Sequence, residues 1–172
     1  MTGMDPFADV LAANADYRRS FSDAATPGLA ARGLAVVTCM DSRISPLEML
    51  GLDKGDAKIL RNAGARVTDD VLRTLVLAVH LLQVDRVMVV PHSDCRMTKV
   101  TDDQVHEEMR KRGIDTRSLE FRTIDDQAET LRCDVQRIRS SPYLPPDLPV
   151  LGCVYDVSSG GLRVEVPLAG GS

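Results

Sequence analysis

The stretch Gly33-Leu34-Ala35-Val36-Val37-Thr38-Cys39-Met40-Asp41-Ser42-Arg43 decides the fold, because an apolar run passes directly into reactive polar side chains. A short continuous apolar run that is bounded in this way predicts a buried strand over about residues 33–38. The pattern recurs at residues 87–91, and His92-Ser93-Asp94-Cys95 follows directly. In open α/β sheets, ligands lie beyond the carboxyl ends of the strands. If the two strands are neighbours, Cys39 and His92 therefore meet at one edge of the sheet.

Segments with strand and helix patterns alternate along the rest of the chain. This alternation predicts an α/β fold with a mainly parallel central sheet, of about four parallel strands plus an antiparallel edge strand, flanked by helices. We expect residues 1–172 to form a single domain in which residues 1–30 are an N-terminal helical arm. The predicted helices cover residues 5–22, 46–51, 69–82, 101–112 and 125–139, and the further strands cover residues 57–60, 150–157 and 162–166.

The composition narrows the function classes before any motif is considered. A chain of 172 residues with 44% hydrophobic side chains can bury a full core without disulfides. A net charge of −4 and an aromatic content of 3% argue against a nucleic-acid partner. The longest apolar stretch, residues 71–84, is too short and too polar to cross a membrane. Four cysteines without a visible secretion signal lead us to expect a cytoplasmic protein.

Cys39, His92 and Cys95 form a candidate metal site. Two thiolates and one neutral imidazole are zinc ligands, and three protein ligands leave one coordination position open, as in catalytic zinc sites. Asp41, two residues after the first ligand, can accept a hydrogen bond from metal-bound water. Arg43 can pair with Asp41 and keep it ionised. In the alternative arrangement, Asp41 binds the metal as a fourth ligand and closes the site.

These motifs, in this order and spacing, resemble the β-class carbonic anhydrases, and above all a short bacterial branch of that family. The resemblance runs from about residue 35 to residue 157. It includes Arg61-Asn62-Ala63-Gly64 and the stretch Val67-Thr68-Asp69-Asp70-Val71. It implies one Zn²⁺ per chain on the three candidate ligands, with Asp41 and Arg43 as a catalytic dyad.

The resemblance also implies an activity and an assembly. The activity is the reversible hydration of carbon dioxide to bicarbonate and a proton, through attack of zinc-bound hydroxide. The assembly is a homodimer or higher homo-oligomer, with the N-terminal helix reaching onto the partner. Two alternatives stay open: a related zinc hydrolase that acts on CS₂ or COS, and a catalytically silent zinc-binding module in which Asp41 permanently caps the metal.

Four residues outside the ligand set and the dyad also carry expectations. Arg96 stands where the family usually has Gly, so it adds bulk and a positive charge directly after Cys95. Asp94 is predicted to cap the helix that follows it, and the alternative is that it serves as an extra acid near the metal. Cys133 and Cys153 are expected to be buried thiols of the core.

Overall fold

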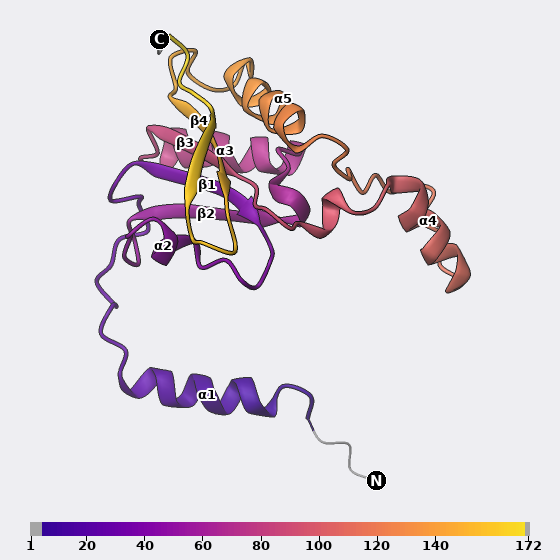
Figure 1. The fold of residues 1–172 in the computed structure, drawn as a ribbon. Coiled ribbons are helices and arrows are strands. Elements are labelled where there is room, and N and C mark those ends of the chain that lie inside the picture. The colour runs from indigo at the N-terminus through magenta and orange to yellow at the C-terminus, as the bar shows by residue number, and fades with distance from the viewer. Residues whose placement is uncertain (1–4, 171–172) are drawn as a thin grey trace.

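The central sheet has five strands in the order β2-β1-β3-β4-β5, in a computed structural model that describes residues 5–170 (Figure 1). The strands β1 to β4 run parallel, and β5 runs antiparallel to β4. The predicted α/β class and the antiparallel edge strand are therefore confirmed. The strand bounds are Leu34–Cys39 for β1, Ala57–Asn62 for β2, Arg86–Val90 for β3, Val150–Tyr155 for β4 and Leu162–Val166 for β5.

The strand β1 lies between β2 and β3, and its register with β3 aligns the two ends that carry the sequence motifs. Thr38 of β1 pairs with Val90 of β3, so the residues after both positions lie at the same edge of the sheet. All six residues of β1 are buried, as expected for an apolar strand inside a parallel sheet. The first and third strands are therefore neighbours in the sheet, as the predicted site requires.

Two helices, α3 (Asp69–Leu81) and α5 (Gln127–Arg139), cover one face of the sheet and share its main hydrophobic core. The short helix α2 (Pro46–Met49) and the loop after it contact the smaller cluster on the other face. The Thr68 hydroxyl accepts a hydrogen bond from the N–H of Val71 and caps α3 at its predicted start. Two single-turn 3₁₀ helices, η1 (Ala63–Ala65) and η2 (Arg96–Thr98), adjoin the candidate site.

The helix α3 is less central than its sequence suggests. Its residues are apolar nearly all round the helix, which favours a position inside the core. Of these residues only Val71, Leu75 and Ala78 are buried, and Leu77 and Leu81 are exposed. The reason is that α3 packs on a single face of the sheet, and no second layer formed by residues 5–170 covers its outward side.

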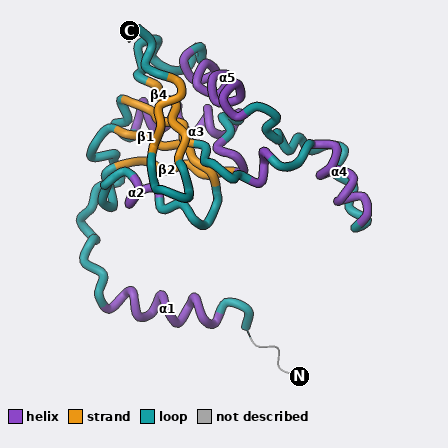
Figure 2. Tube along the Cα trace, in the orientation of Figure 1, coloured by secondary structure: helices purple, strands orange, loops and turns teal. Residues whose placement is uncertain are grey.

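Two further helices extend away from the sheet (Figure 1; helices are purple in Figure 2). The helix α1 (Ala8–Arg19) buries none of its residues in this chain, and α4 (Asp102–Lys111) buries none either. The helix α4 begins with a capping box between Thr101 and Gln104, which explains its sharp start. Among residues 5–170, no helix has both the length and the apolar character that a bilayer crossing requires.

A mostly buried ion pair ties α5 to the segment that follows η1. Arg66 Nε lies 2.8 Å from Asp134 Oδ2, and the two side chains are 17% and 7% exposed. We expect Asp134→Ala to lower the free energy of unfolding by about 3 kcal/mol, because it leaves the guanidinium largely buried without its counter-charge. Denaturant titration at neutral pH measures this change.

The matched control is Glu108→Ala, which breaks the exposed pair between Glu108 and Arg112 on α4. Its effect should be about 0.5 kcal/mol or less. Equal effects of the two substitutions would show that burial of the Arg66–Asp134 pair does not matter.

Candidate metal centre

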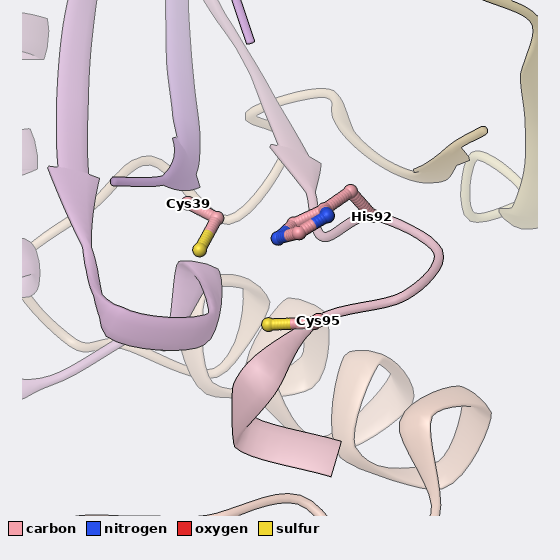
Figure 3. A group of neighbouring side chains, drawn as sticks. All are labelled: Cys39, His92 and Cys95. Carbon is pink, nitrogen blue, oxygen red and sulfur yellow. The ribbon is translucent and has the colours of Figure 1, made fainter. Parts of the chain in front are cut away.

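Three donor side chains converge at the carboxyl edge of the sheet, as Figure 3 shows. Cys39 is the last residue of β1, His92 follows β3, and Cys95 directly precedes η2. Their ligand atoms all lie within 4.8 Å of one another. The three residues are 4%, 0% and 2% exposed, so the donor atoms are removed from bulk water.

The protonation of the His92 ring follows from its hydrogen bond. Nδ1 lies 2.8 Å from the carbonyl oxygen of Ser93, and a carbonyl can only accept, so Nδ1 carries the ring proton. A neutral ring then has a free lone pair on Nε2. That nitrogen is buried and has no hydrogen-bond partner among the described residues. A buried nitrogen with a free lone pair costs free energy unless it binds something, and a metal ion is the partner that suits it.

The thiols of Cys39 and Cys95 differ in pKa. The Cys39 sulfur accepts from the Cys95 thiol and from the backbone N–H of Gly64, whose nitrogen lies 3.4 Å away. These contacts hold the pKa of the Cys39 thiol well below its usual value. The same sulfur–sulfur contact, together with burial, raises the pKa of Cys95. Cys39 is therefore favoured as a thiolate, and a cation bound by both sulfurs would displace the remaining proton.

Gly64 can make its contact with Cys39 because of its backbone conformation. Its φ of +80° lies in the left-handed region, and a Cβ at this position would come within 3.1 Å of Ile124 and 3.3 Å of Met97. Glycine avoids both the conformational strain and the crowding. The Arg-Asn-Ala-Gly segment thus serves the site through a backbone N–H.

Asp41 and Arg43 pair beside the three donors. Asp41 Oδ1 accepts from the backbone N–H and from Nε of Arg43, both at 2.9 Å, and Oδ2 accepts from Nη2 at 2.8 Å. These bonds hold the pKa of Asp41 well below its usual range. Asp41 Oδ2 lies 3.8 Å from His92 Nε2, and the Asp41 side chain is 19% exposed. Asp41 is therefore an ionised carboxylate that borders the donor atoms and still reaches solvent.

Two residues to which the sequence analysis gave no role of their own hold the backbone of the site. Arg61 donates from Nε to the carbonyl of Cys39 at 2.9 Å and from Nη2 to the carbonyl of Asp41 at 2.6 Å. Gln127, at the start of α5, donates to the carbonyl of His92 at 2.9 Å. Arg61 begins the Arg-Asn-Ala-Gly motif and Gln127 belongs to no motif. Neither contact could be predicted, because each joins segments that only the fold brings together.

The structure also places the four other residues that carry an expectation from the sequence. Asp94 does not cap a helix; its carboxylate instead contacts Arg43 and Lys99. Arg96 is exposed. Cys153 is buried in β4 as expected, but Cys133 is exposed on α5, so its assignment to the core was wrong. The face of α5 that packs on the sheet carries Leu131, Val135 and Ile138, and Cys133 lies outside that face.

The donor set fits zinc better than the other common divalent ions. Two buried sulfurs and an imidazole nitrogen are soft or borderline ligands, whereas Mg²⁺ and Ca²⁺ require oxygen. Three protein donors leave a fourth tetrahedral position, and Asp41 lies beside the donors without being one of the three.

Comparisons with known proteins agree with this chemistry. The sequence model of the carbonic anhydrase family matches residues 34–162. Beta-carbonic anhydrase 1 of Mycobacterium tuberculosis is 33% identical over 159 residues, which cover 92% of this chain and 97% of that protein. A carbon disulfide hydrolase of Acidithiobacillus thiooxidans is 28% identical over 152 residues, 77% of this chain and 76% of that one.

The fold agrees as well. The crystal structure of the carbonic anhydrase from Streptococcus mutans matches with a TM-score of 0.89 and 36% identity, covering 96% of this chain and 100% of the other. The matched residues 34–162 include both segments that carry the candidate ligands. From the family match, the identity to the mycobacterial protein and the shared fold, it follows that this chain belongs to the β-class carbonic anhydrase family.

Proposed function

We propose that this chain catalyses the reversible hydration of carbon dioxide to bicarbonate and a proton, with one Zn²⁺ held by Cys39, His92 and Cys95. The observation that carries the proposal is the convergence of two sulfurs and a deprotonated ring nitrogen within 4.8 Å of one another. An ionised carboxylate, that of Asp41, stands 3.8 Å from this nitrogen. Membership of the β-class carbonic anhydrase family supports the same reaction.

The chemistry that zinc supplies at such a site is Lewis acidity, which lowers the pKa of a water molecule toward neutrality. Asp41 accepts a hydrogen bond from the attacking water and thereby aims its lone pair at the carbon of CO₂. Arg43 holds Asp41 in place through three hydrogen bonds. Because Arg43 also keeps the pKa of Asp41 low, Asp41 orients the water and does not retain the proton, which passes on to solvent or buffer.

A second candidate function is hydrolysis of CS₂ or COS. The similarity to a carbon disulfide hydrolase over 77% of this chain favours it. The catalytically silent module is less well supported. It needs Asp41 on the metal, whereas both Asp41 carboxylate oxygens here accept hydrogen bonds from Arg43.

A paired rate measurement separates these functions. Stopped-flow hydration of CO₂ and release of H₂S from CS₂ are followed with the same zinc-loaded preparation. We expect CO₂ hydration far above the uncatalysed rate and little or no H₂S. H₂S release without CO₂ hydration would favour the second candidate, and inactivity toward both substrates would favour the silent module.

We further propose that the chain functions as a homo-oligomer, with a homodimer as the smallest unit and residues 1–30 as an arm that docks on a partner copy. The support is that α1 buries none of its residues within this chain, and that Val10, Leu11 and Tyr17 are all about half exposed or more. Lys54 fixes the base of this arm to the body, donating to Tyr17 Oη at 2.8 Å and to Asp23 at 2.6 Å. Light scattering on the purified protein should give the mass of at least two chains, and a monomer mass would contradict the proposal.

We also propose that the protein is located in the cytoplasm, because its cysteines are not paired in disulfides. Cys39, Cys95, Cys133 and Cys153 are all free thiols in the structure. A zinc site built on two thiolates requires that they stay reduced, and the cytoplasm provides that condition.

A further inference from the structure

The guanidinium of Arg43, which pairs with Asp41, also contacts a second carboxylate. It belongs to Asp94, which lies between His92 and Cys95 in the turn that leads from β3 to η2. Asp94 Oδ2 accepts a hydrogen bond from Arg43 Nη1 at 2.9 Å. The turn that carries two of the proposed zinc ligands is therefore joined directly to the dyad that follows β1.

Arg43 divides its donors between the two acids. Nε and Nη2 donate to the Asp41 carboxylate, Nη1 donates to the Asp94 carboxylate, and Nη2 also reaches the Asp94 carbonyl oxygen at 3.3 Å. All three guanidinium nitrogens thus have an acceptor on one of these two residues. Because the guanidinium is planar and rigid, acceptors on two of its sides fix its orientation as well as its position.

A second cation backs this arrangement. Lys99 Nζ contacts Asp94 Oδ1, so each oxygen of the Asp94 carboxylate contacts one positive group. The side chains of Arg43, Asp94 and Lys99 are all about half exposed. Ion pairs at that exposure contribute little to the free energy of folding. The geometry of the network, and not its contribution to stability, is therefore what distinguishes it from an ordinary surface pair.

The backbone of Asp94 takes part as well. Its φ of +56° lies in the left-handed region, which Asp and Asn visit more readily than other residues with a side chain. In this conformation, the Asp94 carbonyl oxygen is available to Arg43 Nη2. Glycine adopts the same backbone angle without strain, so Asp94→Gly removes the carboxylate and leaves the turn free to keep its shape.

We propose that Asp94, supported by Lys99, is a positioning residue that holds Arg43 against Asp41 and so keeps Asp41 turned away from the metal. The proposal rests on the proposed function, in which Asp41 orients the attacking water. Without Asp94, Nη1 of Arg43 loses its acceptor and the guanidinium is free to rotate about its remaining contacts. Asp41 then loses its fixed partner and can turn toward the three donor atoms, of which His92 Nε2 lies 3.8 Å from Asp41 Oδ2.

The test uses three variants of the zinc-loaded protein. Asp94→Gly removes the carboxylate, Asp94→Asn keeps an oxygen that can accept from Arg43 Nη1, and Lys99→Met removes only the supporting cation. The matched control is Asp115→Asn, because Asp115 pairs with Arg117 in the same way but lies outside the site. For each protein, kcat and KM for CO₂, the zinc content and the melting temperature are measured, and the Asp94→Gly variant is crystallised.

We expect Asp94→Gly to lower kcat by about 10- to 100-fold, with KM, zinc content and melting temperature close to those of the unsubstituted protein. Asp94→Asn should recover most of the loss, Lys99→Met should lose less than Asp94→Gly, and Asp115→Asn should change nothing. In the crystal structure of the Asp94→Gly variant, Asp41 should have lost at least one of its hydrogen bonds to Arg43.

Three results would overturn the proposal. The first is an unchanged kcat in Asp94→Gly, and the second is an Asp41–Arg43 geometry in its crystal structure that matches the present one. The third is a loss of zinc in proportion to the loss of kcat, which would make Asp94 a residue that merely shapes the ligand turn. If the unsubstituted protein does not hydrate CO₂, the proposed function fails, and the crystal structure of the variant still decides the role of Asp94.

Discussion

Replacing Asp41 with Asn is expected to lower kcat for CO₂ hydration by about 100-fold or more and to leave one zinc ion per chain. The substitution keeps the size of the side chain but removes its charge. It also places an NH₂ group where Asp41 Oδ2 now accepts from Arg43 Nη2, so two donors would face each other. Zinc should stay bound because Asp41 is not one of the three converging donors.

Asp115→Asn is again the matched control for this experiment. Asp115 accepts from the N–H and Nε of Arg117 at 3.1 and 3.0 Å and from Nη2 at 2.7 Å, which repeats the Asp41–Arg43 pattern on the surface. Its substitution should leave kcat unchanged. Full activity of Asp41→Asn would refute the role assigned to Asp41, and a loss of zinc in that variant would show that Asp41 is itself a ligand.

Replacing Cys95 with Ala should abolish both zinc binding and activity. Alanine cannot ligate a metal, and two remaining protein donors do not make a zinc site of the kind that proteins use. Loss of an outer hydrogen-bond partner alone weakens metal affinity by about 10- to 100-fold, so loss of a ligand should weaken it further. Zinc per chain after dialysis, measured by mass spectrometry of the metal, gives the result directly.

Cys153→Ala is the control for this substitution. Cys153 is another buried thiol, 2% exposed like Cys95, but it lies within β4 and is not among the converging donors. This variant should retain one zinc per chain and most of the activity, with only the modest loss of stability that a small cavity causes. Equal zinc contents in the two variants would contradict the ligand role of Cys95.

The parts of this molecule that the sequence predicts are those with a strong local signal. The runs at residues 34–39 and 86–90 are apolar and end at reactive side chains, so both the parallel sheet and the edge that carries Cys39 and His92 could be predicted. Short spacings place Asp41 near Arg43 and His92 near Cys95. The two pairs meet only if β1 and β3 are neighbouring strands, and the strand order of the sheet places them side by side.

The roles that the sequence does not reveal depend on contacts between distant segments. Arg61 supports the backbone of Cys39 and Asp41 from the neighbouring strand β2. Asp94 reaches Arg43 across 51 positions of the sequence, and local reasoning assigned its side chain to a helix cap instead. Asp115 and Arg117 show the opposite case. The same acid–arginine spacing occurs there, but they lie apart from the one converging group of metal donors found among residues 5–170. The motif alone therefore does not identify a site.

The most direct test of the account is the zinc content of the purified protein together with the X-ray absorption spectrum at the zinc K edge. We predict one zinc per chain, with two sulfur neighbours at about 2.3 Å and nitrogen or oxygen neighbours at about 2.0–2.2 Å. A protein that folds and is active without stoichiometric metal, or a zinc ion with no sulfur neighbours, would contradict it.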